Sequence, residues 1–146
     1  MDARALFWWR WLLVASMTLT LFGLALLALP RTMQTFFNLL MFGTTWQPPA
    51  FGIEAAGYIG FVFSILGAVL TGWGVLLLYA IYWPFRQGRR EGWQMIALSI
   101  AAWFVPAMTL SLGNGLWQNA ALSLLVAAMF AIPLAATWKT FHKPSG

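Results

Sequence analysis

The sequence predicts an all-α, polytopic membrane protein with four transmembrane helices and one short interfacial helix between the first and the second. Apolar residues make up 62% of the 146 positions and charged residues only 8%. A soluble domain is closer to half apolar and a quarter charged. The apolar residues form four runs, each about as long as the ~20 residues that a crossing requires, or longer. We expect residues 1–146 to form a single domain.

The first apolar run covers residues 11–29 and contains no charge. Pro30 ends it, since proline cannot continue the hydrogen-bond ladder of a helix. A cleaved signal peptide would need a shorter apolar region and a small-x-small cleavage site, which residues 24–28 do not offer. The third and fourth runs, at 93–112 and 118–138, are close to the length of one crossing.

The second run, at 51–83, is long enough for about 50 Å of helix, so it must tilt or project beyond the lipid. Small residues recur along it at every fourth position, a pattern that lets helix backbones approach closely in a membrane. They are Gly52, Ala56, Gly60, Ser64, Ala68 and Gly72. Gly57, Gly67 and Gly74 are further small positions on the same run. We predict that the four-residue series packs inside the bundle, or against another copy or another protein.

The segment at 32–42 has the apolar spacing of an amphipathic helix. Its apolar face would carry Met33, Phe36, Phe37, Leu40 and Met41, with Gln34, Thr35 and Asn38 on the other face. Gly43 is a natural stop. We expect a helix lying in the outer interface or over the mouth of the bundle, followed by an extended lead at 46–49, where two prolines disfavour helix.

The basic residues predict the orientation. Four crossings place seven of the eight Lys and Arg residues on one side, with Arg31 alone on the other. The positive-inside rule makes the richer side cytoplasmic. Both termini are then cytoplasmic, and most tryptophans fall at the two interfaces, where their amphipathic rings favour the headgroup level.

Uncommon polar residues gather on the predicted outer side and define a candidate polar site. They are Arg31, Glu54, Tyr58, Asn114, Gln118 and Asn119. Glu54 lies about 12 Å beyond the lipid-embedded part of its helix, so a solvated acid or an ion pair with Arg31 is the main interpretation, and a ligand or proton site is the other. Turn formation and helix capping are the main interpretation of the three amides, and an outward-facing polar pocket is the alternative.

Trp73, Trp103 and Phe104 form a candidate contact surface for a flat lipophile such as a quinone or carotenoid. Aromatic residues at this density also suit packing and lipid contact. The sequence predicts no cofactor and no metal site, because cysteine is absent and the one histidine, His142, lies in the basic tail. No nucleotide-binding or hydrolase motif is present. The basic residues do not form the solvated stripe that nucleic acid requires.

Several stretches resemble small bacterial four-helix inner-membrane proteins of unassigned function. They are 58–61, 66–68, 72–74, 103–104 and 111–119. Such proteins often carry an acid after the Trp-Phe pair, where this chain has Val105 and Pro106. That departure puts any acid-dependent activity of the group in doubt here. The resemblance implies a bacterial inner-membrane bundle.

Our leading hypothesis is a non-enzymatic accessory or assembly subunit that packs against other membrane proteins, or against copies of itself, and contacts membrane lipids. The alternative is a binding protein for a lipophilic small molecule, a quinone, carotenoid or lipid, with an outward-facing polar cap.

Overall fold

The computed structural model describes residues 3–43 and 52–141, and in these residues the chain is helical throughout, with short connections. The elements are α1 (Ala3–Ala28), α2 (Pro30–Phe42), α3 (Ile53–Ala80), the π-helical turn η1 (Ile81–Phe85), α4 (Arg90–Gly113) and α5 (Trp117–Phe141). Four helices are long and apolar enough to cross a membrane: α1, α3 with η1, α4 and α5. The predicted all-α, four-span fold class is confirmed, and α2 is the short helix expected after the first span.

The helices extend beyond the apolar runs that predict them. α1 begins at Ala3 rather than near residue 11, and α4 begins at Arg90 rather than at 93. Apolar composition reports which part of a helix can lie in lipid. Backbone hydrogen bonding continues through the charged residues Arg4, Arg10 and Glu91 at the helix ends, so composition underestimates helix length.

Two residues set the limits of α2. Leu29 leaves helical geometry, with φ −128° and ψ 51°, and Pro30 follows as the first residue of α2. Proline suits this position because its missing N–H would have no helical partner there. Gly43 ends the helix with φ +67° and donates its N–H to Leu39 O at 3.0 Å. The predicted stop at Gly43 is confirmed, while the predicted lead at 46–49 lies outside the described residues.

The second span is not one regular α-helix. After Ala80 the helix widens into the π-helical turn η1, in which Arg86 N donates to Ile81 O at 3.3 Å. Pro84 lies inside this turn and lacks an N–H, so the ordinary α-helical ladder cannot continue through it. The apolar run at 51–83 continues through Ile81 and Trp83, so hydropathy alone does not indicate the change.

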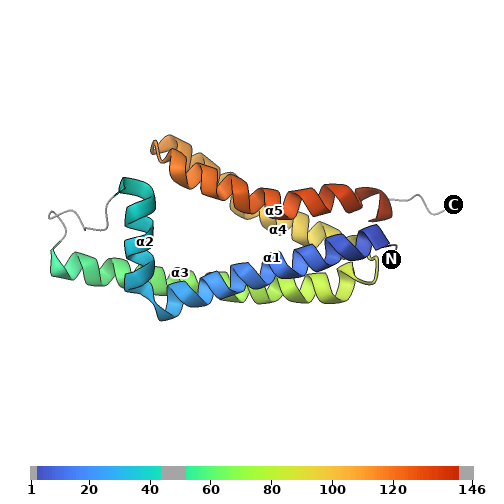
Figure 1. Ribbon diagram of the computed structural model, residues 1–146, viewed down its shortest axis with the longest axis horizontal. Coiled ribbons are helices and arrows are strands. Elements are labelled where there is room, and N and C mark those ends of the chain that lie inside the picture. The colour runs from blue at the N-terminus through green and yellow to red at the C-terminus, as the bar shows by residue number, and fades with distance from the viewer. Residues whose placement is uncertain (1–2, 44–51, 142–146) are drawn as a thin grey trace. The chain divides into compact units, whose positions relative to one another are not determined.

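The chain divides into two compact units. The terminal unit comprises Met1–Met17 and Leu76–Gly146, and the middle unit comprises Thr18–Val75. In the terminal unit α4 and α5 run side by side, joined by a short turn at Gly115 (Figure 1). Its buried side chains include Leu12, Ile81, Phe85, Ile96 and Phe130.

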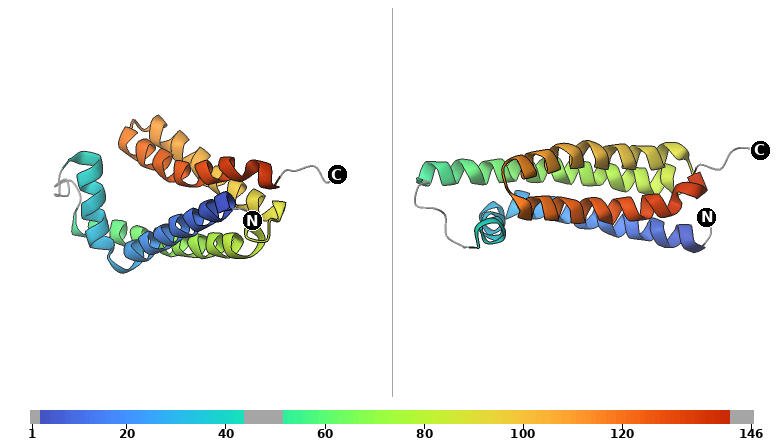
Figure 2. Two further views of the ribbon diagram at one scale, coloured as in Figure 1. Left: turned by 45° about the vertical axis from the view of Figure 1, so that its right-hand side comes forward. Right: turned by 90° about the horizontal axis from the view of Figure 1, so that it is seen from above.

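In the middle unit α2 turns away from the end of α1 and crosses α3 (Figures 1 and 2). Phe37 of α2 joins the three helices of this unit, because its ring lies 6.3 Å from that of Phe22 on α1 and 5.5 Å from that of Phe63 on α3. The contact is edge-on with Phe63, a favourable arrangement for aromatic pairs.

The predicted inward face of α2 is partly wrong. Met33, Phe37 and Met41 are half-buried, in line with the prediction, but Gln34 is only 8% exposed, while Phe36 and Leu40 are exposed. The amphipathic template assumes that water lies opposite the packed face. Where lipid is the solvent, an exposed phenylalanine costs little free energy, and an amide can lie on the face that packs against protein. The apolar spacing therefore does not identify which face of the helix is packed.

Candidate functional site

The predicted small-residue series on α3 does not form the helix contact of the middle unit. A Cβ added at Gly52, Gly60 or Gly72 would have no atom within 4 Å. Four residues of α-helix turn about 400°, so a four-residue series drifts about 40° at each step and about 200° from residue 52 to residue 72. Such a series cannot stay on one face, and Ala68 and Gly72 are exposed.

The contact between α1 and α3 uses a neighbouring set of small residues: Thr20 and Gly23 on α1, and Gly67, Thr71 and Gly74 on α3. A Cβ at Gly67 would lie 2.6 Å from Gly23 O, and one at Gly23 would lie 2.7 Å from Thr71 N. A Cβ at Gly74 would lie 3.1 Å from the Cα of Thr20. The two backbones therefore meet directly, and side chains larger than hydrogen have no room at these glycines.

The spacing of small residues in the sequence indicates this contact. Gly67 and Thr71 are four residues apart, and Gly74 follows three residues later, so the three share one face of the helix. Thr20 and Gly23 have the same three-residue spacing on α1. Two faces of matching small residues predict close packing better than one long series does.

The predicted outer polar residues are divided between the units. In the terminal unit, Asn114 Nδ2 donates to Leu110 O at 2.8 Å, and Asn119 Nδ2 donates to the buried Ser111 Oγ at 2.7 Å. Ser111 Oγ in turn donates to Ala107 O at 2.7 Å. Gln118 is half-buried in the first turn of α5. Asn114 thus terminates α4, as turn chemistry predicts, whereas the bond of Asn119 links α5 to α4 and is not the predicted cap of α5.

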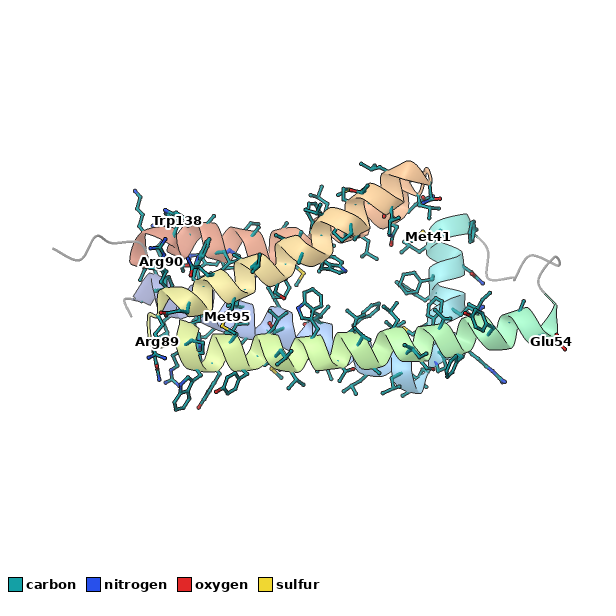
Figure 3. The ribbon with its side chains drawn as sticks, turned by 180° about the vertical axis from the view of Figure 1, so that it is seen from behind. Met41, Glu54, Arg89, Arg90, Met95 and Trp138 are labelled. Atoms are coloured by element: carbon teal, nitrogen blue, oxygen red, sulfur yellow. The ribbon has the colours of Figure 1, made fainter. Side chains whose placement is uncertain are left out.

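In the middle unit the candidate polar residues lie apart from the packed region. Glu54 lies in the first turn of α3, at the end that projects beyond α2, and its side chain is exposed (Figure 3). Tyr58 is 69% exposed, and Arg31 is exposed on the first turn of α2. No ion pair joins Arg31 to Glu54 in the described part of the chain. These three residues do not form an enclosed site within their unit.

The candidate lipophile contacts are also split, since Trp73 belongs to the middle unit and Trp103 and Phe104 to the terminal unit. All three side chains are half-buried. Over the described residues, no three His, Asp or Glu side chains gather as a metal site would need. Asp2 and His142 lie outside these residues.

The terminal unit contains indole hydrogen bonds between helices that sequence reasoning missed. Trp11 Nε1 of α1 donates to Met129 O of α5 at 3.0 Å. Met129 lies four residues before Pro133, whose missing N–H leaves that carbonyl without its helical donor. Trp93 Nε1 of α4 donates to Leu134 O at 2.9 Å. An internal proline is the signal that could have indicated such a site, because lipid cannot satisfy the freed carbonyl.

A third indole bond lies beside the basic residues. Trp9 Nε1 donates to Ile81 O at 3.1 Å, at the start of η1. The guanidinium carbon of Arg86 lies 5.0 Å from the centre of the Trp9 ring and 5.7 Å from the centre of the Tyr82 ring. Arg86 follows η1, and Arg89 and Arg90 begin α4, so the three arginines flank the corner between η1 and α4, which α1 contacts through Trp9.

The corner is held by direct backbone packing. A Cβ at Gly92 would lie 2.7 Å from the carbonyl carbon of Pro84, so the first turn of α4 rests on the backbone of η1. Gly88, with φ +74°, makes the turn, and Arg89 N donates to Pro84 O at 3.0 Å. The three arginines are therefore attached to a closed turn.

The chain matches no known protein family, no characterised protein and no solved structure.

Proposed function

We propose that the protein is an integral membrane accessory or assembly subunit that acts by helix association. Four apolar helices support a place in the membrane. The observation that carries the proposal is that an added Cβ would touch nothing at Gly57, Gly60 or Gly72 of α3. Unlike the whole four-residue series, these three positions lie within about 120° of one another around the helix, and they form its open small-residue surface. Ala68, between them, is exposed. In lipid such a surface admits another helix backbone, because little hydrophobic force otherwise drives helices together.

The surroundings of this surface suit a protein partner within the bilayer. Large apolar side chains beside it are exposed, among them Phe61, Ile65 and Val69. They can pack around an incoming helix, or face lipid when none is bound. We place the chain in a bacterial inner membrane with both termini cytoplasmic, as the resemblance and the distribution of basic residues favour.

The test is native mass spectrometry of the chain extracted gently from its own membrane at its natural level. We expect a stoichiometric partner, a second protein or a second copy, with the wild type, and its loss with Gly60→Leu or Gly72→Leu. Leu66→Ala is the matched control, because it lies on the same helix and adds no bulk. A lone monomer carrying a discrete small-molecule mass would contradict the proposal.

The same variants separate a partner from packing within the chain. If α3 uses this surface only against its own chain, Gly60→Leu lowers the midpoint of unfolding of the isolated protein and no partner is found with the wild type. If the surface binds a partner, the isolated variant unfolds like the wild type and only the complex is lost.

A further inference from the structure

We infer that the corner between η1 and α4 is a binding site for the phosphate of an anionic phospholipid, with Arg86 as its central donor. The inference is independent of helix association, because it concerns the terminal unit and a lipid headgroup. It depends on three features: an imbalance of charge, an arginine held in place by aromatic rings, and a helix N-terminus without a side-chain cap.

The described residues of the terminal unit carry an excess of positive charge. Its described residues contain six basic side chains, Arg4, Arg10, Arg86, Arg89, Arg90 and Lys139, and one acid, Glu91. Arg86, Arg89 and Arg90 are exposed and lie within five positions of one another. Figure 3 shows Arg89, Arg90 and Trp138 at one end of this unit. A basic cluster next to a transmembrane helix attracts anionic headgroups.

Arg86 differs from the other arginines because its position is fixed. Its guanidinium lies within 6 Å of the centres of two rings, Trp9 and Tyr82, which is the range of a cation–π contact. Trp9 is itself held by its hydrogen bond to Ile81 O. Contacts with ring faces leave the N–H groups at the edge of the guanidinium available, and these groups match the oxygens of a phosphate.

The N-terminus of α4 adds a second source of positive potential. Arg89 is its N-cap residue, with extended geometry and no side-chain cap. The aligned backbone dipoles attract an anion to this end of the helix, where Glu91 in the first turn is an opposing charge beside the three arginines. A phosphate beside Arg86 would therefore meet the arginine edge and the dipole of α4 on the same corner. A diester phosphate on an acyl-chain anchor suits this place, because Trp83 and Tyr82 expose apolar area beside it.

The test uses the full-length protein in detergent micelles, with native mass spectrometry to count bound lipid. Phosphatidylglycerol and phosphatidylcholine of the same chain length are added separately. We expect the wild type to retain more phosphatidylglycerol, and Arg86→Gln to weaken that binding about fivefold. Arg10→Gln is the matched control, an exposed arginine of the same unit without a ring contact, and it should change binding less than about twofold.

Three outcomes would overturn the inference. Equal losses in Arg86→Gln and Arg10→Gln would show general attraction to charge without a site. Equal retention of the two lipids would show no preference for an anionic headgroup. Displacement of phosphatidylglycerol by inorganic phosphate in modest excess would show a site for free phosphate.

A second pair of variants covers the case in which Arg86→Gln alters the fold. Tyr82→Leu removes one ring beside Arg86 and leaves the bond from Trp9 to Ile81 in place, whereas Tyr82→Phe keeps the ring. We expect weaker phosphatidylglycerol binding in the first and unchanged binding in the second, with equal helix content by circular dichroism. Identical binding in both variants would contradict the role of the ring in holding Arg86.

Discussion

The two units join their helices by different means. In the middle unit α1 and α3 meet backbone to backbone, and Gly23 and Gly67 leave no room for side chains between them. In the terminal unit Gly92 also packs on the backbone of η1, but α1, α4 and α5 are joined by indole N–H groups that donate to carbonyl oxygens of a neighbouring helix or of η1. Both kinds of contact hold helices together in a solvent of lipid, where burying apolar side chains between helices gains little free energy.

The difference shows what each kind of contact depends on. Backbone packing depends on the absence of atoms, so almost any substitution at the glycines should disturb it. Indole bonding depends on one donor and one acceptor. Met129 O is available as the acceptor because Pro133, four residues later, has no N–H to donate to it. The first contact should be sensitive to added volume and the second to the loss of a single polar atom.

The largest effect is expected from added volume in the middle unit. Gly67→Ala places a Cβ within 3 Å of the backbone of α1, and we expect it to lower the free energy of unfolding by about 2 kcal/mol. The measurement is loss of helical circular dichroism in mixed micelles with increasing dodecyl sulfate. Gly72→Ala is the control, since its Cβ would have no neighbour within 4 Å.

The control should be neutral, or should stabilise by roughly 0.5 kcal/mol, because alanine is the better helix former. If Gly67→Ala and Gly72→Ala behave alike, α1 and α3 do not meet at Gly67. Backbone packing would then no longer distinguish the middle unit from the terminal unit.

A smaller effect is expected from the loss of one indole donor. Trp11→Phe removes the donor to Met129 O and should cost about 1 kcal/mol in the same unfolding measurement. Pro133→Ala supplies a backbone N–H to that carbonyl, so in its presence the cost of Trp11→Phe should fall. A double-mutant cycle measures this coupling. Strict additivity would contradict the idea that the tryptophan replaces the missing helical donor.

Much of the fold could be predicted from the sequence, because bilayer thickness imposes a length on apolar segments. Gly43 as a helix stop was predictable for a similar reason, since left-handed geometry favours glycine. Features that depend on which helices meet could not be predicted. The exposed side of α2 around Phe36 belongs to that class. Pro84 is a local signal that the ordinary helix is interrupted, but it does not predict that the helix widens into a π-helical turn.

The candidate site was harder to predict than the fold. Asn114 fulfils a local role that turn chemistry anticipates, because its hydrogen bond to Leu110 O closes the end of its own helix, whereas the bond of Asn119 to Ser111 joins two helices and was not predicted. The series from Gly52 to Gly72 is regular in sequence, but a helix of 3.6 residues per turn rotates it around the axis, so its regularity identifies no single neighbour. The role of Gly23 required knowledge of its partner helix, which a single sequence does not give.

Trp93→Phe should have a smaller effect than Trp11→Phe. Leu134 O accepts the Trp93 indole N–H at 2.9 Å, but Thr137 Oγ1 also lies 3.3 Å from it. No proline removes the helical donor of this carbonyl, which is the N–H of Trp138. We expect a loss of roughly 0.5 kcal/mol, measured in the same way. A loss as large as that of Trp11→Phe would show that Pro133 does not decide the strength of an indole contact.

The smallest effect is expected at Glu54, which belongs to neither kind of contact. Its side chain is exposed at the start of α3, and no described residue pairs with it. Glu54→Gln should change the free energy of unfolding by less than about 0.5 kcal/mol, as is usual for surface substitutions away from packed features. Native mass spectrometry on the same variant should show unchanged partners and unchanged bound small molecules. Loss of a lipophile with the partners intact would instead favour the ligand-binding hypothesis, because an acid without structural contacts would then be needed for binding.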